Sequence, residues 1–551
     1  MVTVRKTKTS LLAAVLAVFM ILVSVTTACS SNSEETGQSS NSPTQSAAPQ
    51  DNSNEATTYP IQTDKNLTYW AGINSNLAGI RSSLDEVPFF QEWQKRTGVP
   101  LTFISPTAGQ QKEALNVMLA SGEMPDVIEY SWISFPGGPE KAIKDGYIIS
   151  LNELIDQHAP NLKKYLEEHP EVDRLVKTDT GNYYGFPFIR GDESLLVFQG
   201  PIIRQDWLDE LGLEMPTTID EWYTVLKAFK EKKGATAPLS FLSEGRLAAL
   251  GNGAIIGAFD INQGFYLDNG QIKYGPAEPR YKDFLATMSK WYAEGLLDKN
   301  IATTDQKTLD ANIISGATGV SLGNAGSQLG KWTPLLSEKD PRAVLAPAPY
   351  PVLNKGDVPR FGQLDNAFAV NGTAAITSKS KNPELAVKML DYAYSEEGHM
   401  LFNFGIEGVS YTMENGYPTY TDLMMKNPDN LAPAQALSLY IRGNYFGPFV
   451  QDKRYSEQYN VLQSQKDSIE VWKTDAKSTK LPPITATPEE STELAKIMTD
   501  VDTLVNEMTL KIILGSEPLS SYESYMKKME TLNFDRAIEI QEAALDRFNK
   551  R

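Results

Sequence analysis

A serine that could act as a nucleophile lies in Gly319-Val-Ser-Leu-Gly323, which has the G-x-S-x-G spacing of the sharp turn found in many hydrolases. Catalysis there would need a histidine to take the proton of Ser321. The chain contains three histidines, and only His399 follows the serine as the hydrolase order requires. A strand followed by a glycine-rich turn explains the motif better, so we expect no catalysis from Ser321.

Carboxylates could also do chemistry, because two of them flank the cleaved bond in most glycosidases. Asp126 and Glu129 form such a pair in sequence, but a chain with 69 acidic residues contains many close pairs by chance. The distance between the two carboxyl groups would decide whether they could act as a glycosidase pair, and the sequence does not give this distance. A glycosidase therefore stays open as an alternative.

Patterns for cofactors and metals are incomplete in this chain. Gly251, Gly253 and Gly257 follow a G-x-G-x-x-x-G spacing with no clear strand before it, which does not match a dinucleotide-binding loop. The sequence has neither a complete calcium loop of the EF-hand type nor two histidines at metal-ligand spacing. We therefore expect no cofactor and no metal site.

The charge and length of the chain narrow the possible partners and the domain count. The formal net charge is −18, whereas nucleic acids and anionic membrane surfaces attract basic proteins. We therefore expect neither as a partner. The 551 residues are too many for one hydrophobic core, so at least two domains are expected.

Residues 1–28 have the pattern of a secretory signal peptide. The cations Arg5, Lys6 and Lys8 precede an apolar run over residues 11–25, and small residues follow it. The run is short for a helix that would span a membrane, which favours a cleaved signal over a retained anchor helix.

Cys29 follows this signal directly and is the only cysteine, so no internal disulfide is possible. Its position resembles a bacterial lipobox, which implies lipid attachment at Cys29. Residues 29–58 are polar and almost without apolar side chains, so we expect a disordered tether. Together these features predict a protein on the extracytoplasmic face of the cell membrane, held there through a lipid anchor only.

Strands and helices alternate at the start of the globular body. Apolar, β-branched segments predict strands over residues 67–72, 99–104 and 126–130. Helices are predicted between them, over residues 83–98 and 109–122, each ending in a glycine. This alternation is typical of a parallel, doubly wound sheet.

Ligands of such sheets bind beyond the carboxyl ends of the strands. This rule selects Trp70 and Asn74 after the first strand and Tyr130 and Trp132 after the third. Aromatic faces suit the apolar faces of sugar rings, while polar side chains bind the hydroxyls. The four residues are therefore candidates for a sugar site.

Later segments carry local signals for helices and hairpins. Thr218 and Glu221 predict a capping box at a helix start, and Asn269-Gly270 and Asn415-Gly416 predict tight hairpins. Further helices are expected over residues 279–296, 382–398 and 487–515. Three tryptophans within helical patterns are predicted to be core residues, namely Trp207, Trp222 and Trp291.

Four stretches resemble one protein family, the large extracellular solute-binding lipoproteins that serve carbohydrate ABC importers in Gram-positive bacteria. They are LASGEMPDVIEYSW (119–132), RQDWLDELGLEMPTTIDEWYTVLKAF (204–229), SKSKNPELAVKMLDYAYSEEG (378–398) and FNFGIEGVSYTMENGYPTY (402–420). The segment around His399 (EEGHMLF) also resembles the sequence pattern of this family. The resemblance extends over residues 65–549.

The resemblance implies an α/β, two-lobed, periplasmic-binding-protein-like fold of class II with a helical C-terminal region. The first lobe would comprise residues 59–190 and 366–410, and the second lobe residues 191–365. Residues 411–551 would add to the second lobe and form the C-terminal helices. A ligand would bridge the lobes and stabilise a closed state, which docks on the permease subunits of an ABC transporter.

The resemblance also extends the set of site residues. Chain crossings form the hinge in this family, so Phe188 and Arg190 would lie at the cleft floor. Asp365, where the chain crosses back, would accept hydrogen bonds from ligand hydroxyls. Asn324 and Trp332 follow the glycine-rich turn, and Tyr411 lies in the last matching stretch. The full predicted set is Trp70, Asn74, Tyr130, Trp132, Phe188, Arg190, Asn324, Trp332, Asp365 and Tyr411.

The sequence thus predicts a monomeric binding protein, not an enzyme, that delivers an oligosaccharide to an ABC transporter. Binding of a non-sugar solute, such as a peptide, is the first alternative. A secreted glycoside hydrolase or esterase and a glycan-binding adhesin are the others.

Overall fold

The computed structural model describes residues 57–107, 110–243, 254–442 and 446–551. The predicted signal peptide, Cys29 and the tether up to residue 56 lie outside the described residues, as do Gly251 and Gly253.

In the described part of the chain, six strands form the first sheet, in the order β13-β4-β10-β3-β1-β2. Their bounds are β1 (Leu67–Trp70), β2 (Leu101–Ile104), β3 (Val127–Tyr130), β4 (Phe186–Arg190), β10 (Phe368–Ile376) and β13 (Phe449–Gln451). β1 pairs in parallel with β2 and with β3, as the alternating pattern predicts. β10 lies between β3 and β4 and runs antiparallel to both.

A second sheet of the described chain has the order β8-β5-β9, with antiparallel neighbours. Its strands are β5 (Gln199–Arg204), β8 (Val320–Asn324) and β9 (Leu345–Pro347). Two hairpins stand apart from both sheets, β6 (Phe265–Asp268) with β7 (Gln271–Tyr274) and β11 (Tyr411–Glu414) with β12 (Tyr417–Tyr420). The predicted turns close them, since Asn269 and Asn415 both have a positive φ.

The chain passes from the first sheet to the second between β4 and β5 and returns between β9 and β10. It returns to the first sheet once more at β13, which pairs in parallel with β4. The assignment of all of residues 411–551 to the second lobe is therefore wrong for β13. β13 and β4 are far apart in sequence, so no local sequence pattern predicts that they pair.

Helices enclose the first sheet and bury one hydrophobic core with it. They are α1 (Ser75–Ala78), α2 (Pro88–Thr97), α3 (Gln111–Ser121), α4 (Gly138–Lys144), α5 (Asn152–His158), α6 (Pro160–Glu168), α7 (Pro170–Val176), α14 (Pro383–Asp391) and α15 (Glu396–Phe404). Trp93, Leu162 and Leu390 have almost no exposed surface in this core. Burial of such side chains contributes about 1.5–3 kcal/mol each.

A separate core surrounds the second sheet. Its helices are α8 (Gln205–Leu211), α9 (Ile219–Lys233), α11 (Arg280–Ala293), α12 (Gln306–Ser315) and α13 (Gly330–Lys339). Trp207, Trp222 and Trp291 are buried in this core, which confirms the prediction from their helical spacing. Two sheets with two cores confirm the α/β, two-lobed fold class.

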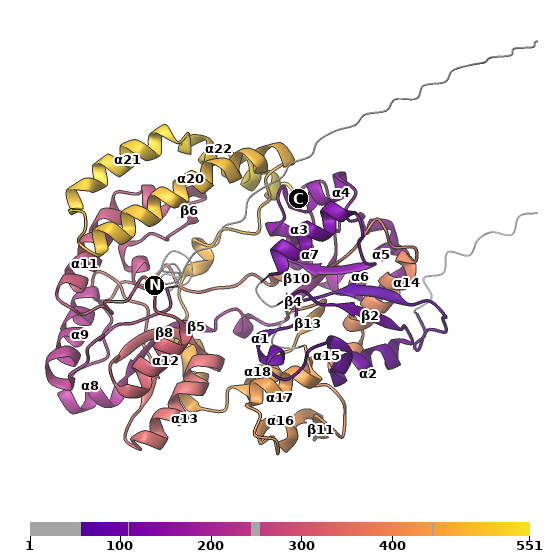
Figure 1. Cartoon of the computed structure of the whole chain (residues 1–551), viewed down its shortest axis with the longest axis horizontal. Coiled ribbons are helices and arrows are strands. Elements are labelled where there is room, and N and C mark those ends of the chain that lie inside the picture. Colours follow the sequence, from indigo (N-terminus) through magenta and orange to yellow (C-terminus); the bar gives the residue numbers. More distant parts are fainter. Residues whose placement is uncertain (1–56, 108–109, 244–253, 443–445) are drawn as a thin grey trace, which may run out of the picture. The chain divides into compact units, whose positions relative to one another are not determined.

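The remaining helices of the described chain follow the β11–β12 hairpin, two of them before β13 and five after it. They are α16 (Asp422–Met425), α17 (Pro433–Tyr440), α18 (Lys453–Tyr459), α19 (Gln463–Val471), α20 (Pro488–Ile513), α21 (Tyr522–Thr531) and α22 (Phe534–Phe548). Figure 1 shows α20, α21 and α22, in yellow, lying together beside α11. Met508 and Ile512 of α20 join the second core, so this helical region belongs with the second sheet.

One predicted helix is wrong in its extent. Residues 382–398 were expected to form a single helix ending at Gly398, but α14 ends at Asp391 and α15 begins at Glu396. Ser395 caps the new start, because its hydroxyl accepts a hydrogen bond from the Gly398 amide at 3.0 Å. A Cβ on Gly398 would lie 1.8 Å from the Tyr392 carbonyl oxygen, so this glycine permits a close approach rather than a helix end.

No helix among the described residues combines the length and the apolar character that a membrane crossing requires.

Candidate functional site

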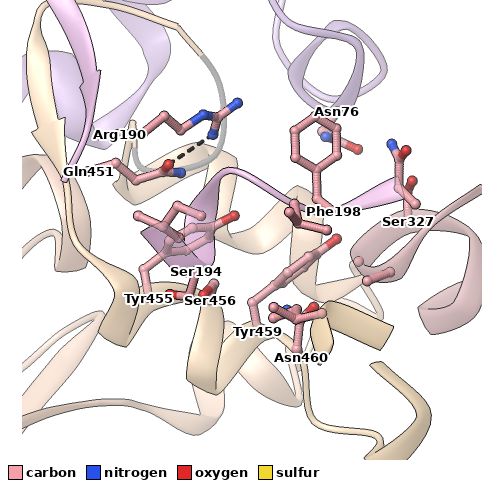
Figure 2. Close-up of a pocket in the computed structure, with 16 residues that line it drawn as sticks. Asn76, Arg190, Ser194, Phe198, Ser327, Gln451, Tyr455, Ser456, Tyr459 and Asn460 are labelled. Atoms are coloured by element: carbon pink, nitrogen blue, oxygen red, sulfur yellow. Dashed lines mark hydrogen bonds between the residues drawn. The ribbon is translucent and has the colours of Figure 1, made fainter. Parts of the chain in front are cut away.

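A cavity of about 300 Å³ is lined by residues from both sheets and from the segments that connect them (Figure 2). Its lining residues are Asn76, Arg190, Ser194, Leu195, Val197, Phe198, Asn324, Ala325, Gly326, Ser327, Gln451, Tyr455, Ser456, Tyr459, Asn460 and Ile469. Aromatic rings, amides and hydroxyls make up most of this wall. We refer to it as the central cavity.

Strand ends position the polar groups of the central cavity. Arg190 is the last residue of β4 and Gln451 the last of β13, and the two are paired in register. Asn324 ends β8, where it pairs with Gln199 and accepts a hydrogen bond from the Gln199 side chain at 3.0 Å. This arrangement follows the rule that α/β proteins bind ligands beyond the carboxyl ends of their strands.

Helix α18 contributes two tyrosines to the wall. Asp452 caps the helix by accepting from the Arg454 amide at 2.8 Å, and Tyr455 and Tyr459 then lie on one face, four residues apart. Their ring centroids are 6.2 Å apart with an interplanar angle of 20°. Burial raises the pKa of the Tyr459 hydroxyl, so this ring is neutral at physiological pH.

The segments next to the tyrosines complete the wall. Phe198 precedes β5 and lies with Tyr455 and Tyr459 in the middle of the view in Figure 2. A Cβ on Gly326 would lie 2.4 Å from Cε1 of Tyr459, so only a glycine lets the segment after β8 approach this ring. The close approach fixes one side of the central cavity.

Arg190 is held firmly from within the protein. Its Nη1 donates to Gln451 Oε1 at 2.8 Å, and its Nη2 donates to Asp365 Oδ2 at 3.1 Å. The guanidinium carbon lies 5.1 Å from the ring centroid of Phe188 and 5.5 Å from that of Phe198. These contacts fix the orientation of the arginine before any ligand arrives.

Two buried polar atoms of the central cavity wall have no hydrogen-bond partner in the described chain. They are Nε of Arg190 and Oδ1 of Asn460. A buried polar atom without a partner costs about 1–3 kcal/mol. A ligand that supplies an acceptor to the arginine and a donor to the asparagine would remove this cost, and a hydroxyl group can do either.

The structure brings part of the predicted site together. Arg190 and Asn324 line the central cavity, and Asp365 lies directly behind Arg190. Asn74 is not in the lining, but its side chain accepts from the amides of Asn76 and Leu77 and so caps α1. Asn74 thereby positions its neighbour Asn76, which does line the cavity.

The predicted aromatic residues lie elsewhere. Trp70, Tyr130 and Trp132 form a cluster of edge-to-face rings, with centroid distances of 6.4 and 5.9 Å. Phe188 stacks on Phe449 in the first core, at 4.8 Å. Tyr411 packs in a small hydrophobic cluster around the β11–β12 hairpin. None of these five lines the central cavity.

Two predicted residues are wrong on grounds of burial. Trp132 and Trp332 are each 0% exposed, so neither presents a ring face to a ligand. Trp332 belongs to the second core, and its Nε1 donates to Asp310 Oδ1 at 2.7 Å. Trp132 is predicted from its place after a strand and Trp332 from its place after the glycine-rich turn, and neither position indicates the direction of the side chain.

Sequence reasoning missed Phe198, Tyr455 and Tyr459. The two tyrosines carried a usable signal, since they lie four residues apart after a capping Asp452. Phe198 follows the first crossing, where a hinge was expected. Its direction depends on the antiparallel pairing of β5 with β8, and no local pattern encodes that pairing.

The residues that suggested hydrolysis have structural roles in the fold. Ser321 lies within β8 with 0% exposure, and its hydroxyl donates to the Leu322 carbonyl oxygen at 3.4 Å. The His399 Nε2 atom is 2.9 Å from Asp452 Oδ2. Although burial alone would raise it, hydrogen bonds from His399 and Arg454 hold the pKa of Asp452 below its usual range. This histidine therefore supports the cap of α18.

Asp126 and Glu129, the carboxylates considered above for a glycosidase, also have structural partners. Asp126 accepts from the Thr68 amide at 2.8 Å and from the Ser380 hydroxyl at 2.7 Å. Glu129 is buried and pairs with Arg442 at 2.6 Å. Both hold elements of the first lobe together.

Comparison with known proteins places this fold among binding proteins. The family model for bacterial extracellular solute-binding proteins matches residues 81–400. Lipoprotein LipO of Bacillus subtilis is 27% identical over 398 residues, which cover 67% of this chain and 72% of LipO. The fructooligosaccharide ABC transporter substrate-binding protein FusA of Streptococcus pneumoniae is 25% identical over 535 residues, 90% of this chain and 92% of FusA.

Solved structures agree with this result. The alginate-binding protein AlgQ2, without calcium ion, has a TM-score of 0.71 at 27% identity, and the match covers 88% of this chain and 99% of AlgQ2. FusA in complex with kestose has a TM-score of 0.69 at 22% identity and shares the fold. The family match extends over more than half of the sequence, and the structure has the two α/β cores of these neighbours. The chain therefore belongs to the bacterial extracellular solute-binding proteins.

Proposed function

We propose that the protein captures an oligosaccharide in the central cavity. The observation that carries this proposal is the combination of three aromatic rings, Phe198, Tyr455 and Tyr459, with the amides of Asn324 and Asn460 in one cavity at the strand ends. Sugar rings stack on aromatic faces, and their hydroxyls bind amides and other fixed polar groups. The ligands named for FusA and AlgQ2 support a carbohydrate, since both proteins are similar to this chain.

The binding step is coupled to delivery in this proposal. A ligand that contacts residues of both lobes favours the arrangement in which those contacts form, by its difference in affinity between states. The permease subunits of an ABC transporter would receive the sugar, as the description of FusA suggests by analogy. In this proposal the protein acts as a monomer, and the described residues of the central cavity bind the ligand without cleaving it.

The proposal places the protein on the extracytoplasmic face of the cell membrane, with lipid on Cys29. The pattern of residues 1–29 and the similarity to lipoprotein LipO support this location. Replacement of the thiol in Cys29→Ala should release the protein into the culture medium. Recovery of that variant in the membrane fraction, as for the wild type, would contradict the lipid anchor.

Calorimetric titration with a panel of oligosaccharides tests the capture proposal. Binding at a hundred times the dissociation constant stabilises a folded protein by about 2.7 kcal/mol, so a thermal-shift screen can first select the glycan class. The expected result is saturable binding of one glycan class, with the glycan recovered intact. Binding only of non-sugar solutes, or cleavage of the glycan during incubation, would overturn the proposal.

A further inference from the structure

The central cavity has a simple distribution of charge. Among its described lining residues, Arg190 is the one with a full charge at neutral pH, and no carboxylate belongs to the lining. The other polar groups of the lining are amides and hydroxyls. The net charge that a ligand meets therefore depends on what stands behind Arg190.

Asp365 stands behind Arg190 and neutralises it. The distance from Arg190 Nη2 to Asp365 Oδ2 is 3.1 Å, and the side chains are 17% and 33% exposed. Gln363 donates to the other carboxylate oxygen of Asp365 at 3.2 Å, which fixes the carboxylate toward the arginine. The remaining terminal nitrogen, Nη1, donates to Gln451. Each terminal nitrogen of Arg190 thus already donates one hydrogen bond within the protein, and its charge is balanced by Asp365.

A second cation, Lys480, lines a neighbouring cavity together with Asp365. Burial lowers the pKa of its ammonium group, while Asp365 opposes this shift. The amine is absent from the lining of the central cavity. Asp365 is therefore the carboxylate that both cations face.

Two ion pairs lie on segments that border the central cavity. Asp192 pairs with Lys453 at 3.0 Å, next to α18, and Glu193 pairs with Lys477 at 2.6 Å, next to Ser194. These pairs are partly exposed and are worth little to stability. Within each of these two pairs the positive and negative charges balance.

From this charge matching we infer that the central cavity selects neutral oligosaccharides over glycans that carry carboxylate or sulfate groups. The inference rests on the proposed function and names its substrate class. An anionic glycan would have to displace Asp365 from Arg190 or enter with its own charge unpaired. A buried charge without a partner is strongly disfavoured, whereas a neutral hydroxyl needs only the free Nε of Arg190 and the amides.

The test compares neutral oligosaccharides with uronic-acid oligosaccharides of equal length, by calorimetric titration of the purified protein at low and at physiological salt. The expected result is binding of neutral glycans at least about tenfold more tightly, with little dependence on salt. Tighter binding of the uronic-acid series would overturn the inference while leaving carbohydrate capture in place. If neither series binds, both the preference for neutral glycans and the proposed oligosaccharide capture are contradicted.

The variant Asp365→Asn provides a second, independent test of the inference. The change keeps the size of the side chain and leaves the charge of Arg190 without its partner, so the ratio of the two dissociation constants should move toward uronic-acid glycans by about tenfold or more. Asp365→Glu retains the carboxylate, and the preference for neutral glycans should persist in it. An unchanged ratio in folded Asp365→Asn would overturn the assigned role of the aspartate. If that variant fails to fold, the wild-type ratio and its salt dependence decide.

Discussion

At the scale of residues, Tyr459 is the side chain on which ligand binding should depend most clearly. It packs with Tyr455 at 6.2 Å between centroids and faces the segment after β8 through Gly326. Aromatic contacts of this kind are worth about 0.5–1.5 kcal/mol beyond buried area. Tyr459→Ala should therefore weaken oligosaccharide binding by about tenfold in a calorimetric titration.

Tyr459→Phe is the matched control for this prediction. It keeps the ring and removes only the hydroxyl, so it should bind within a few-fold of the wild type. Equal affinity of the alanine variant and the wild type would show that the ring does not contact the ligand.

A second residue-scale prediction concerns the buried pair of Arg442 and Glu129. The side chains are 8% and 5% exposed, and Tyr69 donates a further hydrogen bond to Glu129 at 2.5 Å. Removal of one partner leaves an unpaired buried charge, so Arg442→Met should lower the free energy of unfolding by about 3–5 kcal/mol. Urea unfolding measures this loss.

The double variant Arg442→Met with Glu129→Gln should recover much of that stability, because the amide still accepts from Tyr69. Arg536→Met is the surface control, since Arg536 and Glu493 are 37% and 43% exposed, and it should cost less than about 1 kcal/mol. A similar loss in Arg442→Met and Arg536→Met would contradict the role of burial.

The site could be predicted from the sequence only in part at this scale. The expected hinge selected Arg190 and Asp365 and the glycine-rich turn selected Asn324, and these residues lie in or directly behind the central cavity. The strand-end rule also selected Trp132 and the glycine-rich turn also selected Trp332, and both are buried. Position along a strand is a local property, whereas the direction of a side chain after the strand depends on what packs against it.

At the scale of elements, the capping box of α9 couples stability to pH. Glu221 accepts from the Thr217 amide at 2.8 Å and pairs with Lys355 at 3.0 Å. The amide hydrogen bond of Thr217 and then Lys355 lower the pKa of Glu221 to about 2. Since the folded pKa lies below that of the unfolded chain, about 4.3, the contribution is present above this value and is lost as the pH falls toward 2.

Glu221→Ala should therefore cost about 1 kcal/mol at pH 7, and the difference from the wild type should shrink at pH 3. Unfolding in urea at both pH values measures it. Glu530→Ala, at an exposed position of α21, serves as a control for general charge effects. A difference that stays constant between pH 7 and pH 3 would contradict the capping role of the ionised carboxylate.

Elements were predicted well where their signals are local. The capping box of α9, the start of α20 and the two Asn-Gly turns lie where the sequence predicts them. Gly398 misled the prediction, because a glycine that ends a helix and a glycine that allows a close approach have the same letter. Its contact with the Tyr392 carbonyl depends on the fold of the connection between α14 and α15.

At the scale of the whole molecule, two sheets and two cores were expected from the resemblance and are present. Residue patterns alone predicted the parallel start of the first sheet but not the insertion of β10 or the return at β13. Those pairings join strands that are far apart in sequence, and their order is set by packing of the complete chain. The central cavity depends on the same crossings, which explains why only part of it was foreseen.

The most direct test of the central claim is calorimetric titration of the purified protein with neutral oligosaccharides, for the wild type and Tyr459→Ala. The claim predicts saturable binding at one site per chain, weaker by about tenfold in the variant, and glycan recovered without cleavage. Absence of binding across the neutral and acidic carbohydrate panel, or equal affinity of the two proteins for the same glycan, would contradict sugar capture in the central cavity.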